Sequence, residues 1–248
     1  MPLPSHHRPL PARRRGLVAV AALLAALWLL PALAAAAEVS YLVMPVQVKR
    51  KDATEWRPLN LGDQVFEGDA VRTGMGARVE VLLADKRVFR IGQATEVEVS
   101  GLDTRGGGLK ARFKLVLGRF WGTLVNGISE TAGERFQVAT TTATIGVKGT
   151  SFGVDYDKAD RESRVAVVTG RVAAIPPPAE VQAPTEIAGP REIAPPQEVT
   201  RAQWEVIVSR DQKLIIRPGE APRTEPLTDE DKRDPWLVFN AQRDALLR

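Results

Sequence analysis

The side chains best placed for chemistry in this sequence are four carboxylates that fall within eight residues: Asp155, Asp157, Asp160 and Glu162. Oxygen ligands at this density could hold a hard cation such as calcium. The segment lacks the central glycine and the longer reach to a final glutamate of an EF-hand loop, and basic residues between the acids neutralise much of the charge. We therefore interpret the segment as a solvated hairpin turn and predict no metal site.

The amino-acid composition excludes several kinds of catalytic and metal site. Both histidines lie within residues 1–37 and the chain has no cysteine. The rest of the chain therefore has no histidine base, no cysteine nucleophile, no usual zinc site and no histidine ligand for haem. The run from Gly146 to Thr150 lacks the spacing of a phosphate-binding loop, and no Gly-x-Ser-x-Gly nucleophile elbow occurs.

One enzymatic alternative stays open at this point. A carboxylate-based hydrolase needs two acidic side chains that converge in the fold, and any two of the 30 acidic residues could do so. Nothing in the sequence marks such a pair. We expect a non-enzymatic protein with no cofactor, and we assign no catalytic or cofactor-binding residue.

Residues 1–37 have the layout of a secretory signal peptide. Arginines at 13–15 precede an apolar run from Leu17 to Leu30, and an alanine-rich segment follows Pro31. The alternative is an uncleaved membrane anchor, because the apolar segment is about long enough to span a bilayer. We expect a periplasmic or secreted protein that contacts a membrane only through this leader, and only where the leader is kept.

The excess positive charge of the chain also belongs to the leader. Without residues 1–37, the chain has 30 basic and 30 acidic residues, so its formal charge is zero. Such a body has no overall attraction to a phosphate backbone, and we therefore expect no nucleic-acid partner.

Residues 38–175 alternate apolar and polar residues with a period of two. Val79, Val81 and Leu83 fall on one face of an expected strand, and turn signals such as Asn126-Gly127 separate the short apolar runs. This pattern predicts an all-β domain of many short strands, stacked as an irregular sandwich or as a β-solenoid. The pattern alone does not choose between the two.

Two further segments follow this domain. Residues 176–202 contain a hexapeptide repeat with Glu second, a β-branched residue third and Pro sixth. This composition predicts an extended Pro-rich linker or loop, with a docking strip as the alternative. Residues 203–248 are predicted to form a terminal β-hairpin, with its turn at Ser209 to Gln212, and a short C-terminal helix.

The helix begins at Asp234-Pro235-Trp236, which combines an N-cap acid with a proline in the first turn. We expect one helical face to pack on the β domain rather than on a partner. That face contains Trp236, Phe239, Arg243, Leu246 and Leu247.

The segment from Phe136 to Val154 resembles the signature of FecR-domain proteins, and the wider resemblance covers about residues 58–175. The segment departs from the family pattern at Thr141, where proline is common, and at Lys148, where arginine is common. The signature residues, including one on the closing strand, are Ala143, Gly146, Val147, Lys148, Gly149, Thr150, Phe152, Val154 and Gly170.

We interpret this signature as structural rather than catalytic. Gly146 and Gly149 bracket two residues of a strand that must bend or pack closely, which indicates a bulge. Phe152 and Val154 alternate into the core, and Thr150 is expected to form a local hydrogen bond.

The best-known FecR-domain proteins relay a signal from an outer-membrane transporter across the periplasm to a cytoplasmic sigma factor. Only 16 residues precede the apolar run here, too few for their cytoplasmic anti-sigma region. The resemblance therefore implies a stand-alone exported FecR domain that binds a macromolecule, as a sensor or adaptor in envelope signalling, with an envelope protein as partner. The alternative is a carbohydrate or cell-wall binding module that uses exposed aromatics such as Trp56, Trp121 or Trp204.

Overall fold

The computed structural model describes residues 37–83, 87–103, 110–123, 136–175 and 205–247, and for Lys148 and Gly149 it describes the backbone alone. These ranges belong to one structural unit, Ala35–Arg248. The predicted leader, except for its last residue, and the Pro-rich segment 176–202 lie outside the described residues. In the described part of the chain, no helix is long and apolar enough to cross a membrane.

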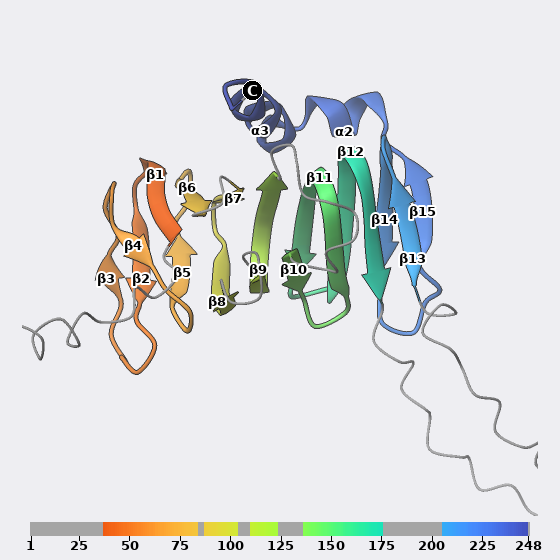
Figure 1. Cartoon of the computed structure of the whole chain (residues 1–248). Coiled ribbons are helices and arrows are strands. Elements are labelled where there is room, and N and C mark those ends of the chain that lie inside the picture. Colours follow the sequence, from red (N-terminus) through yellow and green to blue (C-terminus); the bar gives the residue numbers. More distant parts are fainter. Residues whose placement is uncertain (1–36, 84–86, 104–109, 124–135, 176–204, 248) are drawn as a thin grey trace, which may run out of the picture. The chain divides into compact units, whose positions relative to one another are not determined.

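Strands dominate the fold, as the period-two pattern predicts, and the all-β prediction with a short C-terminal helix is confirmed (Figure 1). The elements are β1 (Ala37–Val43), β2 (Val46–Lys49), β3 (Arg57–Pro58), β4 (Gln64–Val65), β5 (Ala70–Thr73), β6 (Arg78–Leu83), β7 (Val88–Ile91), β8 (Glu96–Asp103), β9 (Lys110–Thr123), β10 (Phe136–Ala139), β11 (Thr144–Asp157), β12 (Glu162–Ile175), β13 (Val206–Ser209), β14 (Gln212–Ile216), β15 (Arg223–Pro226), α2 (Asp229–Arg233) and α3 (Pro235–Ala245).

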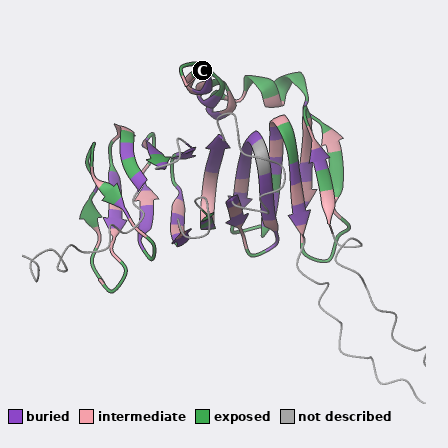
Figure 2. Cartoon of the chain, in the orientation of Figure 1, coloured by how far each residue is buried: buried purple, intermediate pink, exposed green. Residues whose placement is uncertain are grey.

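Strand β9 organises the sheet because it is long enough to pair with four neighbours. It runs antiparallel to β7, β8 and β11 and parallel to β10. Alternate side chains are buried in the first half of β9, and all four side chains of β7 are buried (Figure 2). Phenylalanines from four of the strands meet in the core with ring centroids 4.5 to 6.5 Å apart, namely Phe89, Phe113, Phe120, Phe136 and Phe152.

Strand β11 changes its partner midway along its length. Its first part, Thr144 to Val147, pairs with β10, and its second part, Ser151 to Tyr156, pairs with β9. The register with β12 shifts between Lys148 and Ser151, which marks a bulge at the change. The structure thus shows the bent strand that the two signature glycines predict.

The end of the sheet differs from the prediction. Strands β13 and β14 do not form a hairpin with each other, because both run antiparallel to β12 and follow one another along it. Asp211 lies between them with a φ of 60°, and its N–H donates to the Val167 carbonyl at 2.9 Å. The expected turn is therefore a bulge in one long strand, and the hairpin instead joins β14 to β15. Short polar segments are typical of both features, so the sequence pattern does not separate them.

The residues Leu227–Ala245 cross the strands at the top of Figure 1, and we refer to them as the strap. Helix α2 begins with a capping box between Thr228 and Asp231. Helix α3 begins at Asp234, whose side chain accepts hydrogen bonds from the N–H groups of Trp236 and Leu237. The predicted start of the C-terminal helix is thus confirmed.

Candidate functional site

Helix α3 lies on the sheet through a mostly polar face. Trp236, Asn240 and Asp244 follow each other at intervals of four residues and are all buried. Leu246, which the sequence places on the packed face, is 76% exposed. The prediction that the helix packs on the β domain is correct. The predicted packed face is wrong in part, because the sheet presents charged groups beneath α3 and polar residues of the helix pack against them.

The charged groups beneath α3 form a buried ion network. Arg90 of β7 has a side chain only 1% exposed, and it contacts Glu80 of β6 and Asp244 of α3, each at 2.6 Å. Arg243 of α3 donates to Glu80 at 2.7 Å. Burial raises the pKa of Glu80, but the hydrogen bonds from Arg243 and Arg90 outweigh it and hold the pKa below its ordinary value. Two cations and two carboxylates therefore neutralise each other.

Asp244 connects this network to β9 as well. Its carboxylate accepts hydrogen bonds from the Thr123 hydroxyl at 2.8 Å and from Trp121 Nε1 at 3.2 Å. One side chain of the strap therefore satisfies buried donors from two strands. Removing one member of such a buried network typically costs about 3–5 kcal/mol, so these contacts fix the C-terminal half of the strap on the sheet.

The N-terminal half of the strap is held by more exposed ion pairs. Arg119 of β9 lies between Asp155 of β11, at 2.9 Å, and Asp234 of the strap, at 3.1 Å. Lys213 of β14 contacts Asp231 of α2 at 2.8 Å. Burial raises the pKa of Asp155, although Arg119 opposes that effect. Because these pairs are partly solvated, each contributes less than the buried network.

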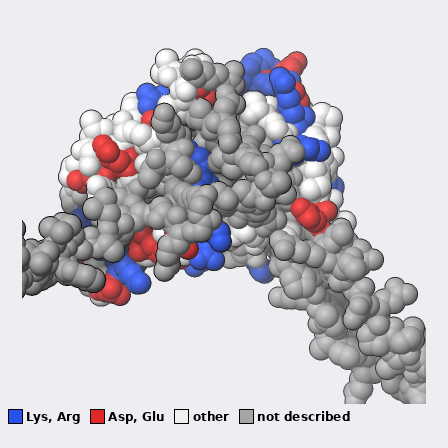
Figure 3. All heavy atoms as spheres, in the orientation of Figure 1, with Lys and Arg blue, Asp and Glu red and all other residues white. Residues whose placement is uncertain are grey.

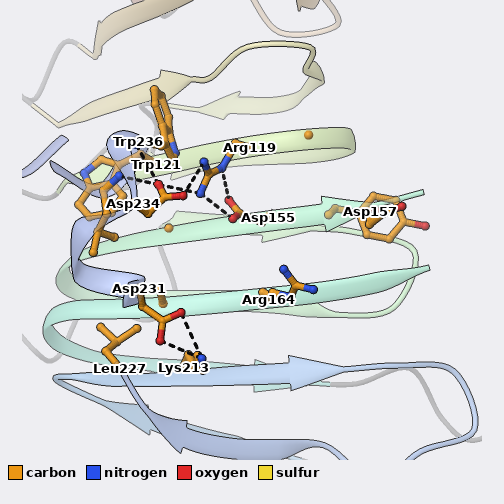
Figure 4. A pocket seen from close by; sticks show the side chains of 15 residues that line it. Arg119, Trp121, Asp155, Asp157, Arg164, Lys213, Leu227, Asp231, Asp234 and Trp236 are labelled. Carbon is orange, nitrogen blue, oxygen red and sulfur yellow. Dashed lines mark hydrogen bonds and ion pairs between the residues drawn. The ribbon is translucent and has the colours of Figure 1, made fainter. Parts of the chain in front are cut away.

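A hollow of about 420 Å³ lies between the strap and the sheet, and we call it the strap hollow (Figure 4). Its floor follows from the strand register. Gly153 of β11 and Ala166 of β12 lie opposite each other, between Trp121 of β9 and Lys213 of β14. Gly153 has no side chain and Ala166 has only a methyl group, so the space above them is unfilled. Apolar groups of the strap line its other side, namely Leu227, Trp236 and Leu237.

The strap hollow is lined by charges of both signs. Three are cations and four are carboxylates, namely Arg119, Arg164 and Lys213 with Asp155, Asp157, Asp231 and Asp234. Figure 4 shows Arg164 between the group around Arg119 and the pair of Lys213 with Asp231. The Arg164 Nε donates to Glu162, whereas its two terminal nitrogens bond no other side chain in the described ranges. Arg164 is thus paired with Glu162 through Nε, and among these three lining cations it is the one whose terminal nitrogens bond no side chain in the described ranges.

The predicted acidic cluster is divided by the fold. Asp157 and Asp160 lie at the turn that joins β11 to β12, where the Asp157 carboxylate accepts from the N–H of Ala159 at 2.7 Å, as a hairpin turn requires. Asp155 and Glu162 instead point to arginine partners. Within the described ranges, no three acidic side chains are grouped as metal ligands.

The signature residues lie in the sheet and not at the strap hollow. Val147, Phe152 and Val154 are buried in the core, which supports a structural role. The Thr150 hydroxyl is buried and finds no hydrogen-bond partner among the residues that the structure describes, so the expected local hydrogen bond is wrong. Gly170 has a φ of 75° next to the β11 bulge, a conformation that favours glycine. The others in these strands are Ala143, Gly146, Lys148 and Gly149.

Of the three aromatic residues named for glycan stacking, the structure describes two, Trp56 and Trp121. Trp121 is fully buried, so it offers no exposed ring. Trp56 lies against the cations of Lys49, at 5.2 Å from the ring centroid, and Arg72, at 4.2 Å. Trp204 lies outside the described residues.

Sequence reasoning missed the buried network and the hollow. The network joins residues that are far apart in the chain, since Arg90 pairs with both Glu80 and Asp244. The hollow depends on the strand register that sets Gly153 opposite Ala166. Glu80 lies between Val79 and Val81, so alternation places it on the face opposite to the core and gives no signal of its burial.

Comparison with protein-family models agrees with the resemblance found in the sequence. Residues 69–173 match the family model described as FecR protein. Two crystal structures of a candidate anti-sigma factor from Parabacteroides distasonis ATCC 8503 are similar, with 16% identity and TM-scores of 0.44 and 0.45. Each alignment covers 63% of this chain and 59% of that chain. No curated protein matches the chain. The match confirms the resemblance for residues 69–173, and this part of the chain corresponds to a FecR domain.

Proposed function

We propose that this chain is a non-enzymatic, exported FecR-domain protein that binds another protein, as a sensor or adaptor in cell-envelope signalling. The observation that carries the proposal is the FecR domain at residues 69–173, because FecR proteins are regulatory and point to envelope signalling. The signal-peptide layout of residues 1–37 supports export.

The charges of the folded unit support a protein partner rather than a polyanion. Lysine and arginine side chains alternate with acidic ones in small groups on the face shown in Figure 3. The carboxylates nearest the hollow are paired with arginine or lysine, as in Asp155 with Arg119 and Asp231 with Lys213. This pairing fits a binding protein better than an acid and base poised for hydrolysis, where one carboxyl group must stay protonated.

The surface for this partner includes two exposed methionines. Met44 is 55% exposed and Met75 is 76% exposed. Their turns lie side by side, because the Gly74 N–H donates to the Pro45 carbonyl at 3.0 Å. Flexible, polarisable methionine side chains are common on surfaces that adapt to a protein partner. Glycan binding would instead require exposed aromatic rings, and Trp121 is buried.

Affinity capture tests the proposal. The tagged mature chain, residues 38–248, is incubated with envelope extracts of its own source, and bound proteins and glycans are both identified. The Met44→Ser/Met75→Ser variant is compared with Leu61→Ser, a matched control because Leu61 is 67% exposed on a different turn. We expect one envelope regulator or transporter, retained by the control and lost by the double variant. Recovery of wall polysaccharide alone would overturn the proposal in favour of a cell-wall binding module.

A further inference from the structure

The strap hollow has the size of a small-molecule site. Its volume of about 420 Å³ falls within the range of about 300–1,000 Å³ that is usual for ligand pockets. The floor is rigid, because Gly153 and Ala166 belong to neighbouring paired strands. The wall on the strap side is apolar at Leu227 and Trp236, which are both largely buried. A ligand with a small apolar part would fit between this wall and the floor.

The charged groups at the two ends of the hollow form ion pairs with each other. Arg119 is shared by Asp155 and Asp234 at one end, and Lys213 is paired with Asp231 at the other. These pairs hold the walls in place, and Arg164 lies between them (Figure 4). Arg164 pairs with Glu162 through Nε and its side chain is 62% exposed, so its terminal nitrogens are available to a ligand.

Arg164 selects a planar anion. A guanidinium presents its terminal N–H groups as a fork that matches a carboxylate, and such charge-assisted pairs are strong and directional. Arg164 uses only its Nε within the described residues, on Glu162, so both terminal nitrogens remain for a ligand. Asp155 lies directly opposite Arg164 in the strand register, yet the ion pair that Asp155 makes is with Arg119.

The carboxylates around Arg164 select a positive charge as well. The lining has one more carboxylate than cation, which disfavours a ligand that is only an anion. One oxygen of Asp157 accepts from the turn N–H groups, and the other has no partner among the described residues. Burial disfavours the charged form of Asp155, so a cation brought by the ligand would stabilise that carboxylate.

We propose that the strap hollow binds a small zwitterion, an amino acid or a short peptide with free ends, whose carboxylate pairs with Arg164 and whose ammonium lies between Asp155 and Asp157. The apolar part of the ligand contacts Leu227 and Trp236. In a sensor, this hollow would be the ligand site, but the proposal rests on the geometry of the hollow alone. Its test is therefore independent of whether the protein partner is found.

Calorimetric titration of residues 38–248 with the dipeptide Ala-Ala and with L-alanine tests the charge requirement. N-acetyl-Ala-Ala lacks the ammonium and Ala-Ala amide lacks the carboxylate, while both keep the apolar groups. We expect at least one of the two free-ended probes to bind, and each blocked dipeptide to bind about tenfold more weakly or worse, because each loses a charge-assisted hydrogen bond. Equal binding of free and blocked dipeptides, or no binding of either free-ended probe, would overturn the proposal.

Variants place the ligand in the hollow. Arg164→Gln removes the fork, and Ala166→Phe fills the floor, so both should abolish binding. Arg171→Gln is the matched control, because Arg171 is an exposed arginine on the same strand, outside the hollow. Thermal unfolding of each variant shows whether it is folded. Undiminished binding by a folded Arg164→Gln protein, or equal loss in the Arg171→Gln control, would contradict the assigned site.

Discussion

Substitution of Asp244 by alanine tests whether the buried network fixes the strap. The change removes the 2.6 Å ion pair with Arg90 and leaves the Trp121 and Thr123 donors without their shared acceptor. Arg90 keeps Glu80, but part of its buried charge loses compensation. We expect a loss of about 3–5 kcal/mol in the free energy of unfolding, the usual effect of removing one member of a buried pair.

At about 2–4 °C per kcal/mol for a protein of this size, the loss corresponds to a Tm lower by roughly 6–20 °C. Urea unfolding of residues 38–248, followed by tryptophan fluorescence, measures the free energy directly. Gln242→Ala is the control, since Gln242 is exposed on the same helix, and it should change the free energy by less than about 0.5 kcal/mol. A loss below about 1 kcal/mol for Asp244→Ala would refute the assigned role of the network.

Three further predictions follow from single groups. Folding lowers the pKa of Glu80, so the stability that its carboxylate contributes is present above its ordinary pKa of 4.5. That stability is lost as the pH falls through the pKa of the folded state. The Tm of Glu80→Gln should therefore vary less with pH in acid than the Tm of the wild type. Gly118→Ala should lower the free energy of unfolding in urea far more than Gly62→Ala. Both glycines have positive φ, but only the new Cβ at Gly118 meets backbone, 2.7 Å from the Thr95 Cα. Similar losses of free energy in the two variants would contradict the packing. Thr150→Val should leave stability unchanged or raise it by up to about 1 kcal/mol in urea unfolding, because it removes a buried hydroxyl without a described partner, and a clear loss would show that the hydroxyl is bonded.

Much of the sheet could be predicted from the sequence because its rules are local. Alternation at Val79, Val81 and Leu83 follows from the two-residue period of a strand, and all three are buried. The start of α3 follows from an acid and a proline in adjacent positions. The bulge in β11 follows from two closely spaced glycines, which few strands tolerate without a bend.

The strap and its hollow could not be predicted because they depend on strand register and on contacts between segments that are far apart in the chain. Ala166 and Gly153 make a hollow only because the pairing of β11 with β12 sets them opposite each other. The buried carboxylate of Asp244 on α3 is satisfied by Arg90, which is 154 residues before it, and by Trp121 and Thr123 of β9. Helical periodicity alone assigns the apolar Leu246 to the buried face, and it cannot anticipate that the sheet offers charges there.

Site-specific photo-cross-linking in intact cells of the source tests the protein-binding role most directly. A photoreactive amino acid replaces Met75 in one strain and Leu61 in another, both exposed in the folded unit. Mass spectrometry then identifies the adducts from the envelope fraction. The account predicts one envelope protein that cross-links at position 75 and not at position 61. The absence of a protein adduct at position 75, or the same adducts at both positions, would contradict it.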